Sequence, residues 1–148
     1  MPVMLAVILL TVEVVAYAMN SFAANDVLTD VHSAIIEEVE LVSNLPSGGT
    51  LDPSVQYASC NAGSVVLPTG SNATITSIVT STLAAKNINF SASDPANTNI
   101  TMNQVSGFDV YVINFSGTAN TLVIPTFLSE LMPINVDTVV SIKDACTP

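Results

Sequence analysis

The chain has very little positive charge. Its 148 residues include two cationic side chains, Lys86 and Lys143, against twelve Asp and Glu, which gives a formal net charge of −10. Nucleic-acid-binding proteins neutralise phosphates with Lys and Arg, and polybasic proteins use the same residues to bind anionic membranes. The composition therefore excludes both of these classes.

The residues that carry catalysis and metal binding are scarce as well. There is no Trp, His32 is the only His, and two Cys are too few for a zinc site. The sequence has no acid–base pair of carboxylates, Gly-rich phosphate loop, nucleophile elbow or haem attachment motif. A lone His on a helix is more often solvated or at an interface than a catalytic base. We therefore expect a protein that is not an enzyme and holds no metal ion or cofactor.

Apolar residues, by contrast, are abundant and unevenly placed. Hydrophobic residues make up 49% of the chain and charged residues 9%, with a mean hydropathy of +0.59, which excludes a highly charged disordered protein. Residues 1–24 are almost wholly apolar, and Glu13 is their only charge. As a helix this segment is about 36 Å long, enough to cross a bilayer core of about 30 Å.

Three interpretations of the apolar segment compete. Ser21-Phe22-Ala23 resembles a signal-peptide cleavage site, but a signal peptide begins with a basic region. A transmembrane anchor normally has flanking Lys or Arg, and the first cation of this chain is Lys86. We favour the third interpretation, a mature N-terminus from which a basic leader has been removed.

The apolar segment continues into an amphipathic one. Residues 25–45 carry apolar side chains three and four apart, with acidic residues between them, which is typical of a helix packed on one face. No Pro or Gly interrupts residues 3–45, Pro2 suits a first turn, and the Pro46-Ser47-Gly48-Gly49 cluster ends the helix. We expect one helix of about 42 residues, about 60 Å long, within an N-terminal region of residues 1–45. The apolar stripe consists of Leu28, Val31, Ile35, Val39 and Val42.

Residues 51–148, after a linker at residues 46–50, form the head. The head is rich in Ser, Thr, Asn and β-branched residues, so the fold class is α+β, with a long N-terminal helix before a small β-rich, sandwich-like head. Residues 74–86 fit either a helix or a strand, and residues 127–132 fit a short helical turn. The predicted strands are Ser64–Leu67, Asn87–Ala92, Asn99–Met102, Phe108–Phe115, Thr121–Ile124 and Ile134–Ile142.

Cys60 and Cys146 lie near the two ends of the head. In an extracellular protein they are expected to form a disulfide, and two buried free thiols are the alternative. The bond would close a loop of 87 residues and stabilise the head by about 4 kcal/mol.

Four Asn-x-Ser/Thr sequons also lie in the head. Such sequons are acceptors for N-glycans on secreted proteins. Asn114 is the weakest candidate because it falls within a predicted strand. The candidate sites are Asn72, Asn89, Asn99 and Asn114.

An apolar mature helix, an amphipathic continuation and a β-rich head with two cysteines together resemble a type IV pilin. The sequons and the nearly cation-free head are more similar to archaeal type IV pilins, which are relatives of archaellins. Bacterial members usually carry Glu at the fifth mature position and a helix-kinking Pro. Here Leu5 takes that place, which fits archaeal members, since they often lack that Glu. The kinking Pro is also missing, so the helix is expected to stay unbroken in the filament.

The resemblance implies an extracellular cell-surface filament that serves adhesion or surface attachment. A prepilin peptidase would remove the leader, and the pilus assembly machinery would take the precursor from the cytoplasmic membrane. Copies of the chain would then polymerise with one another through their helices. The residues expected to contact other copies are Met1, Leu5, Ile8, Leu9, Val12, Glu13, Val15, Ala16, Phe22, Leu28, Val31 and Ile35.

Glu13 is the exception in this apolar surface. An ionised, unpaired carboxylate in a helix bundle costs several kcal/mol, so we expect it to be neutral or paired with a neighbour's Met1 amine or Thr11. The alternative is that it lies near a surface groove without a role. Two other functions also fit the sequence. One is a monomeric surface-binding protein anchored by its N-terminus, and the other is a minor pilin or pseudopilin of a secretion machine.

Overall fold

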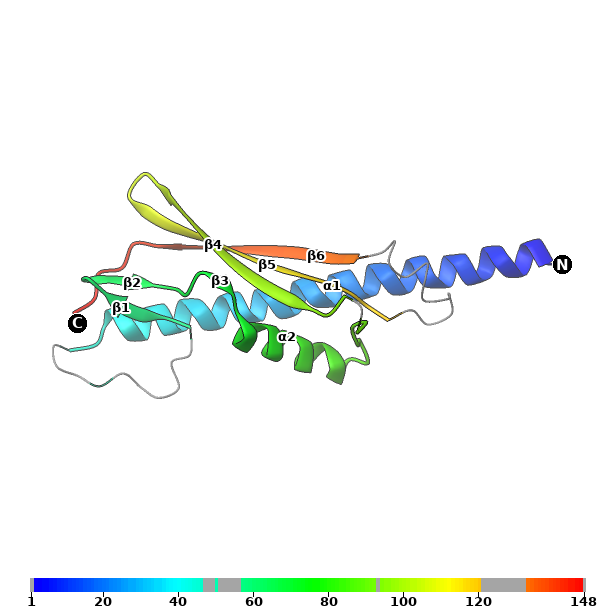
Figure 1. Ribbon diagram of the computed structural model, residues 1–148, viewed down its shortest axis with the longest axis horizontal. Coiled ribbons are helices and arrows are strands. Elements are labelled where there is room, and N and C mark those ends of the chain that lie inside the picture. The colour runs from blue at the N-terminus through cyan, green and yellow to red at the C-terminus, as the bar shows by residue number, and fades with distance from the viewer. Residues whose placement is uncertain (1, 47–49, 51–56, 93, 121–132, 148) are drawn as a thin grey trace.

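The molecule is elongated around one long helix. The computed structural model describes residues 2–46, 50, 57–92, 94–120 and 133–147. Helix α1 (Pro2–Ser43) runs along the length of the molecule, and the N- and C-terminal ends lie at opposite ends of it (Figure 1). The predicted 42-residue helix is confirmed. It ends where the backbone N–H and the side-chain amide of Asn44 both donate to the Glu40 carbonyl, just before Pro46.

The head is built on a four-stranded antiparallel sheet. Its strands are β3 (Gly70–Ser71), β4 (Asn97–Val105), β5 (Phe108–Thr118) and β6 (Pro133–Ile142), in the order β3-β4-β5-β6. A separate hairpin pairs β1 (Ser59–Asn61) with β2 (Ser64–Val66). Ser106 and Gly107 both have positive φ, at 53° and 83°, as a two-residue turn between twisted strands requires.

Most of the predicted elements are present, with differences at the short ones. Four of the predicted strands coincide with β2, β4, β5 and β6, whereas β1 and β3 were not predicted. The strand predicted at residues 87–92 is wrong, since Phe90 makes only an isolated bridge with Ala119 and Asn87 turns the chain with φ 62°. The predictions for residues 121–124 and 127–132 lie outside the described residues.

The ambiguous segment at residues 74–86 is helical and forms α2 (Ala73–Ala85). Asn72 caps it, with Oδ1 accepting a hydrogen bond from the Ile75 N–H at 3.0 Å. An Asn at this position satisfies one of the free amides of the first turn. Ile75, Val79 and Leu83 are all buried, so packing of this apolar stripe outweighs the strand preference of its Thr and Val residues.

The core lies between the sheet and the two helices. Along β5 the side chains of Tyr111, Ile113 and Phe115 are buried on the helix-facing side, and those between them lie on the outer face. The amphipathic half of α1 supplies the opposite wall, with Leu28 and Ile35 fully buried. The α+β class is confirmed, but the sandwich-like head is not. Among the described strands, the four-stranded sheet packs against α1 and α2 because their apolar stripes cover its inner face.

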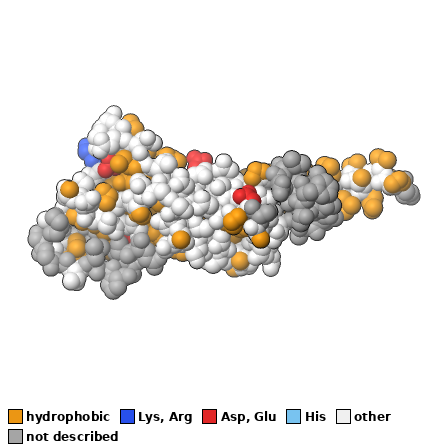
Figure 2. All heavy atoms as spheres, viewed as in Figure 1, with side chains coloured by type: hydrophobic (Ala, Val, Ile, Leu, Met, Phe, Trp, Pro, Cys, Tyr) orange, Lys and Arg blue, Asp and Glu red, His pale blue; other side chains and the backbone are white. Residues whose placement is uncertain are grey.

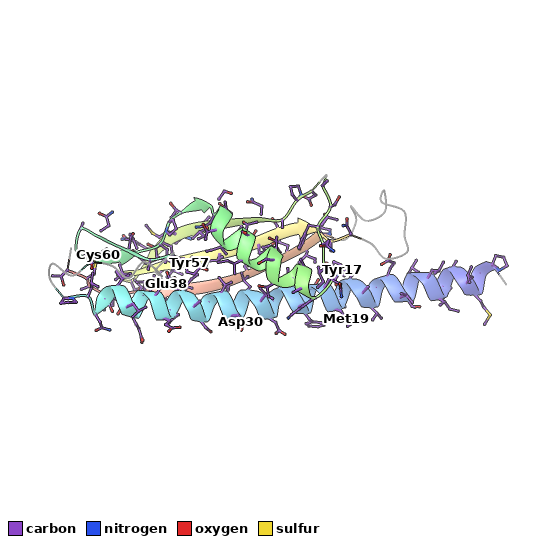
Figure 3. All side chains as sticks on the ribbon, turned by 90° about the horizontal axis from the view of Figure 1, so that it is seen from below. Tyr17, Met19, Asp30, Glu38, Tyr57 and Cys60 are labelled. Carbon is purple, nitrogen blue, oxygen red and sulfur yellow. A yellow bond between two sulfur atoms is a disulfide. The ribbon has the colours of Figure 1, made fainter. Side chains whose placement is uncertain are left out.

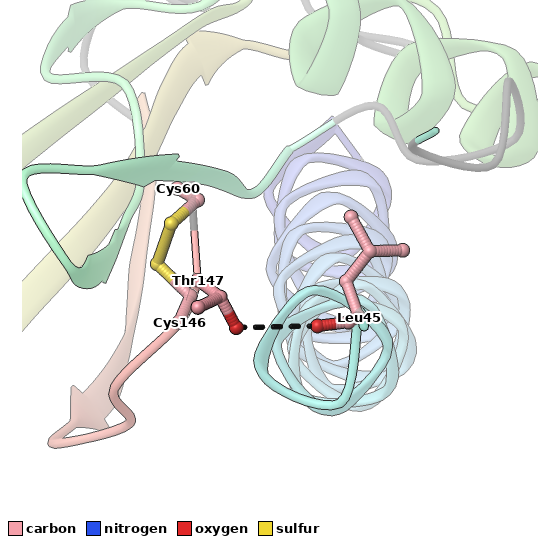
Figure 4. Close-up of a disulfide and its surroundings, with 4 residues drawn as sticks. All are labelled: Leu45, Cys60, Cys146 and Thr147. Carbon is pink, nitrogen blue, oxygen red and sulfur yellow. Dashed lines mark hydrogen bonds between the residues drawn. A yellow bond between two sulfur atoms is a disulfide. The ribbon is translucent and has the colours of Figure 1, made fainter. Parts of the chain in front are cut away.

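The predicted disulfide is confirmed and joins β1 to the C-terminal segment. Cys60 and Cys146 are bonded, with Sγ atoms 2.03 Å apart and Cα atoms 5.8 Å apart. Next to it, the Thr147 hydroxyl donates to the Leu45 carbonyl at 3.4 Å (Figure 4). The end of the chain is thereby held against both the β1–β2 hairpin and the end of α1.

Gly117 allows the close approach of β5 and the segment before β4. A Cβ atom at this position would lie 2.9 Å from the Ala96 Cα and 2.9 Å from the Phe90 ring. We therefore expect Gly117→Ala to destabilise the head by about 1–3 kcal/mol, as overpacking of a tight core does. Thermal unfolding measures the effect, with Ser116→Ala on the outer face as the control. Equal melting temperatures for the two variants would contradict this account of the contact.

Candidate functional site

The first half of α1 is an exposed apolar surface, here called the apolar rod (residues 2–22). Its large apolar side chains are 37–74% exposed, and only 6% of the most apolar 18-residue window of α1 is buried. Figure 2 shows hydrophobic side chains along the projecting end of the molecule. Soluble monomers rarely leave a continuous apolar patch of this kind in water. The exposed residues are Val3, Met4, Leu5, Val7, Ile8, Leu9, Leu10, Val12, Val14, Val15, Met19 and Phe22.

The residues expected to contact other copies fall into two groups. Leu5, Ile8, Leu9, Val12, Val15 and Phe22 are exposed on the apolar rod, and Ala16 is half-buried where the rod meets the head. Leu28, Val31 and Ile35 instead face the sheet and are buried within the chain itself. Of the residues expected to contact other copies, those of the rod are therefore the ones that remain accessible. Met1 lies outside the described residues.

Glu13 belongs to the inner side of α1. It is 4% exposed, and its side chain has an interaction partner within the chain. One turn further, the Tyr17 hydroxyl donates to the Pro133 carbonyl at 3.1 Å. The Thr11 hydroxyl donates to the Val7 and Ile8 carbonyls of its own helix. Glu13 is thus part of the contact between α1 and the rest of its own chain.

Because Glu13 is buried within its own chain, its substitution is expected to change the stability of the monomer. Glu13→Leu removes a buried polar interaction, which costs about 1–3 kcal/mol, so the detergent-solubilised monomer should unfold at a lower temperature. Val14→Leu, on the adjacent exposed position, is the control and should leave the melting temperature unchanged. A Glu13→Leu monomer of normal stability that no longer associates would instead assign Glu13 to a contact between copies.

His32 has a structural position between α1 and β6. Its Nδ1 lies 3.0 Å from the Thr138 hydroxyl, in a partly buried contact. Nearby on α1, the Glu38 carboxylate accepts hydrogen bonds from the Tyr57 and Ala58 N–H groups. Burial, together with the Glu38 charge, raises the pKa of the Tyr57 phenol above its usual 10. In the described part of the chain, no three His, Cys, Asp or Glu residues are grouped as metal ligands.

The four sequon asparagines have different surroundings. Asn72 caps α2 and Asn89 is exposed after it. Asn99 and Asn114 are direct cross-strand partners on β4 and β5. The Asn114 side-chain amide also donates to the Asn135 Oδ1 at 2.6 Å. Since Cβ atoms of such partners lie about 5 Å apart, there is little room for a glycan on both.

A groove lies where the apolar rod enters the head. It has a volume of about 410 Å³, and Ala16, Met19 and Asn20 of α1 form one wall. The other wall comes from the end of α2 and the residues after it, including Lys86, Ile88 and Asn89. No sequence pattern predicts this groove, because its walls are more than 60 residues apart along the chain.

Comparisons with known proteins do not assign the chain to a family. No family model, no curated protein and no solved structure matches this chain. By length and composition, α1 is a helix that could cross a membrane. The function of the chain is therefore inferred from the surface that it exposes.

Proposed function

We propose that the chain is the structural subunit, a major pilin, of an extracellular filament of the archaeal type IV pilus kind, which serves adhesion or surface attachment. The observation that supports this proposal is the division of α1. The apolar stripe of its second half is buried against the sheet of its own head, whereas the large apolar side chains of residues 3–22 are exposed.

Polymerisation removes this apolar surface from water. With about 1,500–2,000 Å² buried per helix at about 25 cal/mol per Å², the gross gain is on the order of 40 kcal/mol before the cost of ordering. A helix packed against helices of other copies makes contacts that need not close on themselves, and such contacts produce an open filament. The disulfide suits an oxidising extracellular environment.

Electron microscopy of material sheared from the cell surface tests the proposal. We expect filaments of uniform width that contain this polypeptide, identified by mass spectrometry of the purified fraction. Recovery of the polypeptide only in detergent-extracted membranes would instead support a monomeric surface protein anchored by α1. Recovery in trace amounts within filaments built from another chain would support a minor pilin or pseudopilin.

A further inference from the structure

The outer side of α1, turned away from the sheet, changes character along its length. Positions three and four residues apart define an outer stripe of α1, which runs from Ile8 to Glu40. Figure 3 shows Met19 and Asp30 on this side of the helix. The stripe is apolar up to Phe22 and carries exposed acidic side chains beyond it. The acidic members are Asp26, Asp30, Glu37 and Glu40.

Only two side chains can offer positive charge to this acidic half. Lys143 lies over the Phe108 ring, 4.8 Å from its centre, beside the tip of the β4–β5 hairpin. Lys86 is exposed at the end of α2 and lines the groove where the apolar rod enters the head. Lys86 therefore places a positive charge in the wall of a groove whose surface is mainly apolar.

We propose that this groove receives the outer stripe of α1 from a second copy of the chain, with Lys86 against the acidic residues of that stripe. The inference rests on the proposed function and names one contact surface within the filament. The groove is continuous with the apolar rod, because Ala16 and Met19 belong to both. A polymer of chains that each carry a charge of −10 also gains most from a contact that places a cation against a cluster of acids.

The positions of these groups set how far two parallel copies are offset. Lys86 lies level with residues 16–20 of its own α1. On the second copy, Asp26 lies six residues beyond Asn20 and Glu40 lies twenty residues beyond it. At 1.5 Å per residue, the axial offset is about 9–30 Å. This shift also places part of the second copy's apolar rod beside that of the first.

Zero-length cross-linking of native filaments tests the contact. A carbodiimide converts a carboxylate into an O-acylisourea, and an adjacent lysine amine attacks its acyl carbon to form an amide and release a urea. Because the chain has only two lysines, few cross-links are possible. We expect a covalent dimer on denaturing gels whose peptides join Lys86 to Asp26, Asp30, Glu37 or Glu40. Dimers in which Lys86 is joined only to acids of the head, or filaments that give no Lys86 dimer, would overturn the proposal.

Charge reversal provides a second, independent test. Lys86→Glu should raise the critical concentration for polymerisation by about tenfold or more, since it places like charges together. Lys143→Glu changes the net charge by the same amount, from −10 to −12, and should polymerise normally. One of the single reversals Asp26→Lys, Asp30→Lys, Glu37→Lys or Glu40→Lys should restore assembly of the Lys86→Glu chain.

The outcomes separate this inference from the proposed function. Suppose that the unmodified chain forms filaments, but Lys86→Glu and Lys143→Glu raise the critical concentration equally or no acidic reversal rescues Lys86→Glu. The proposed contact at Lys86 is then wrong, and the proposed function is unaffected. If the unmodified chain forms no filaments, the proposed function itself fails. Asn89 also lines the groove, so a glycan found on Asn89 in assembled filaments would contradict the docking of a helix there.

Discussion

Ile8→Asp is expected to leave the chain folded and to abolish its polymerisation. Ile8 is 57% exposed on the apolar rod, so the substitution removes no contact within the head. In a filament the new carboxylate would be buried without a designed partner, which costs about 3–5 kcal/mol. The equilibrium constant for adding each chain should therefore fall at least about 100-fold. Sedimentation of filaments and electron microscopy measure the loss.

Asn25→Asp is the matched control for this variant. It introduces the same charge into the same helix, at an exposed position outside the outer stripe, and should polymerise normally. The melting temperature of the detergent-solubilised Ile8→Asp monomer should equal that of the unmodified chain. Normal filaments from Ile8→Asp would show that the apolar rod is not the assembly surface.

The second large effect is expected on the stability of the head when the disulfide is removed. Replacing both Cys60 and Cys146 with Ala opens a loop of 87 residues and should destabilise the head by about 4 kcal/mol. For a chain of this size, that corresponds to a melting temperature lower by about 10 °C. Calorimetry of the monomer measures this change, and reduction of the unmodified chain should produce the same shift.

Filaments should nevertheless survive reduction at ambient temperature. The disulfide lies at the end of the molecule opposite the apolar rod (Figures 1 and 4), so it makes no direct contribution to helix packing between copies. Reduction should therefore loosen the heads and leave the filament core intact. Filaments that dissolve on reduction alone would contradict this separation of head stability from assembly.

Local signals in the sequence predicted the long elements well. The helix over residues 2–43 follows from a run without Pro or Gly, with Pro2 in its first turn and a breaker cluster after Leu45. The strands over residues 97–105, 108–118 and 133–142 contain the predicted ones. In each case a periodic or β-branched pattern extends over many residues, so local preference and burial agree.

Short elements and ambiguous patterns were decided by tertiary packing. β3 contains only Gly70 and Ser71 and pairs with Ile100 and Asn99, and no local pattern of two residues predicts a strand. α2 carries Thr and Val residues that favour strands, yet its apolar stripe packs into the core. The sandwich-like head was expected from composition, which contains no information that α1 covers the inner face of the sheet.

By itself, the sequence determined the α+β class, the long helix, its apolar first half and the pair of cysteines, because each depends on residues close together in the chain or on composition. Only the tertiary structure decided which apolar residues of α1 are left for other molecules. Leu28 and Ile35 are as apolar as Ile8, yet they are buried because β6 lies against that half of the helix. Glu13, in the apolar first half, is buried as well, and Lys86 and Met19 line the same groove. Contacts between residues so distant in sequence arise from the arrangement of whole elements, which local patterns do not encode.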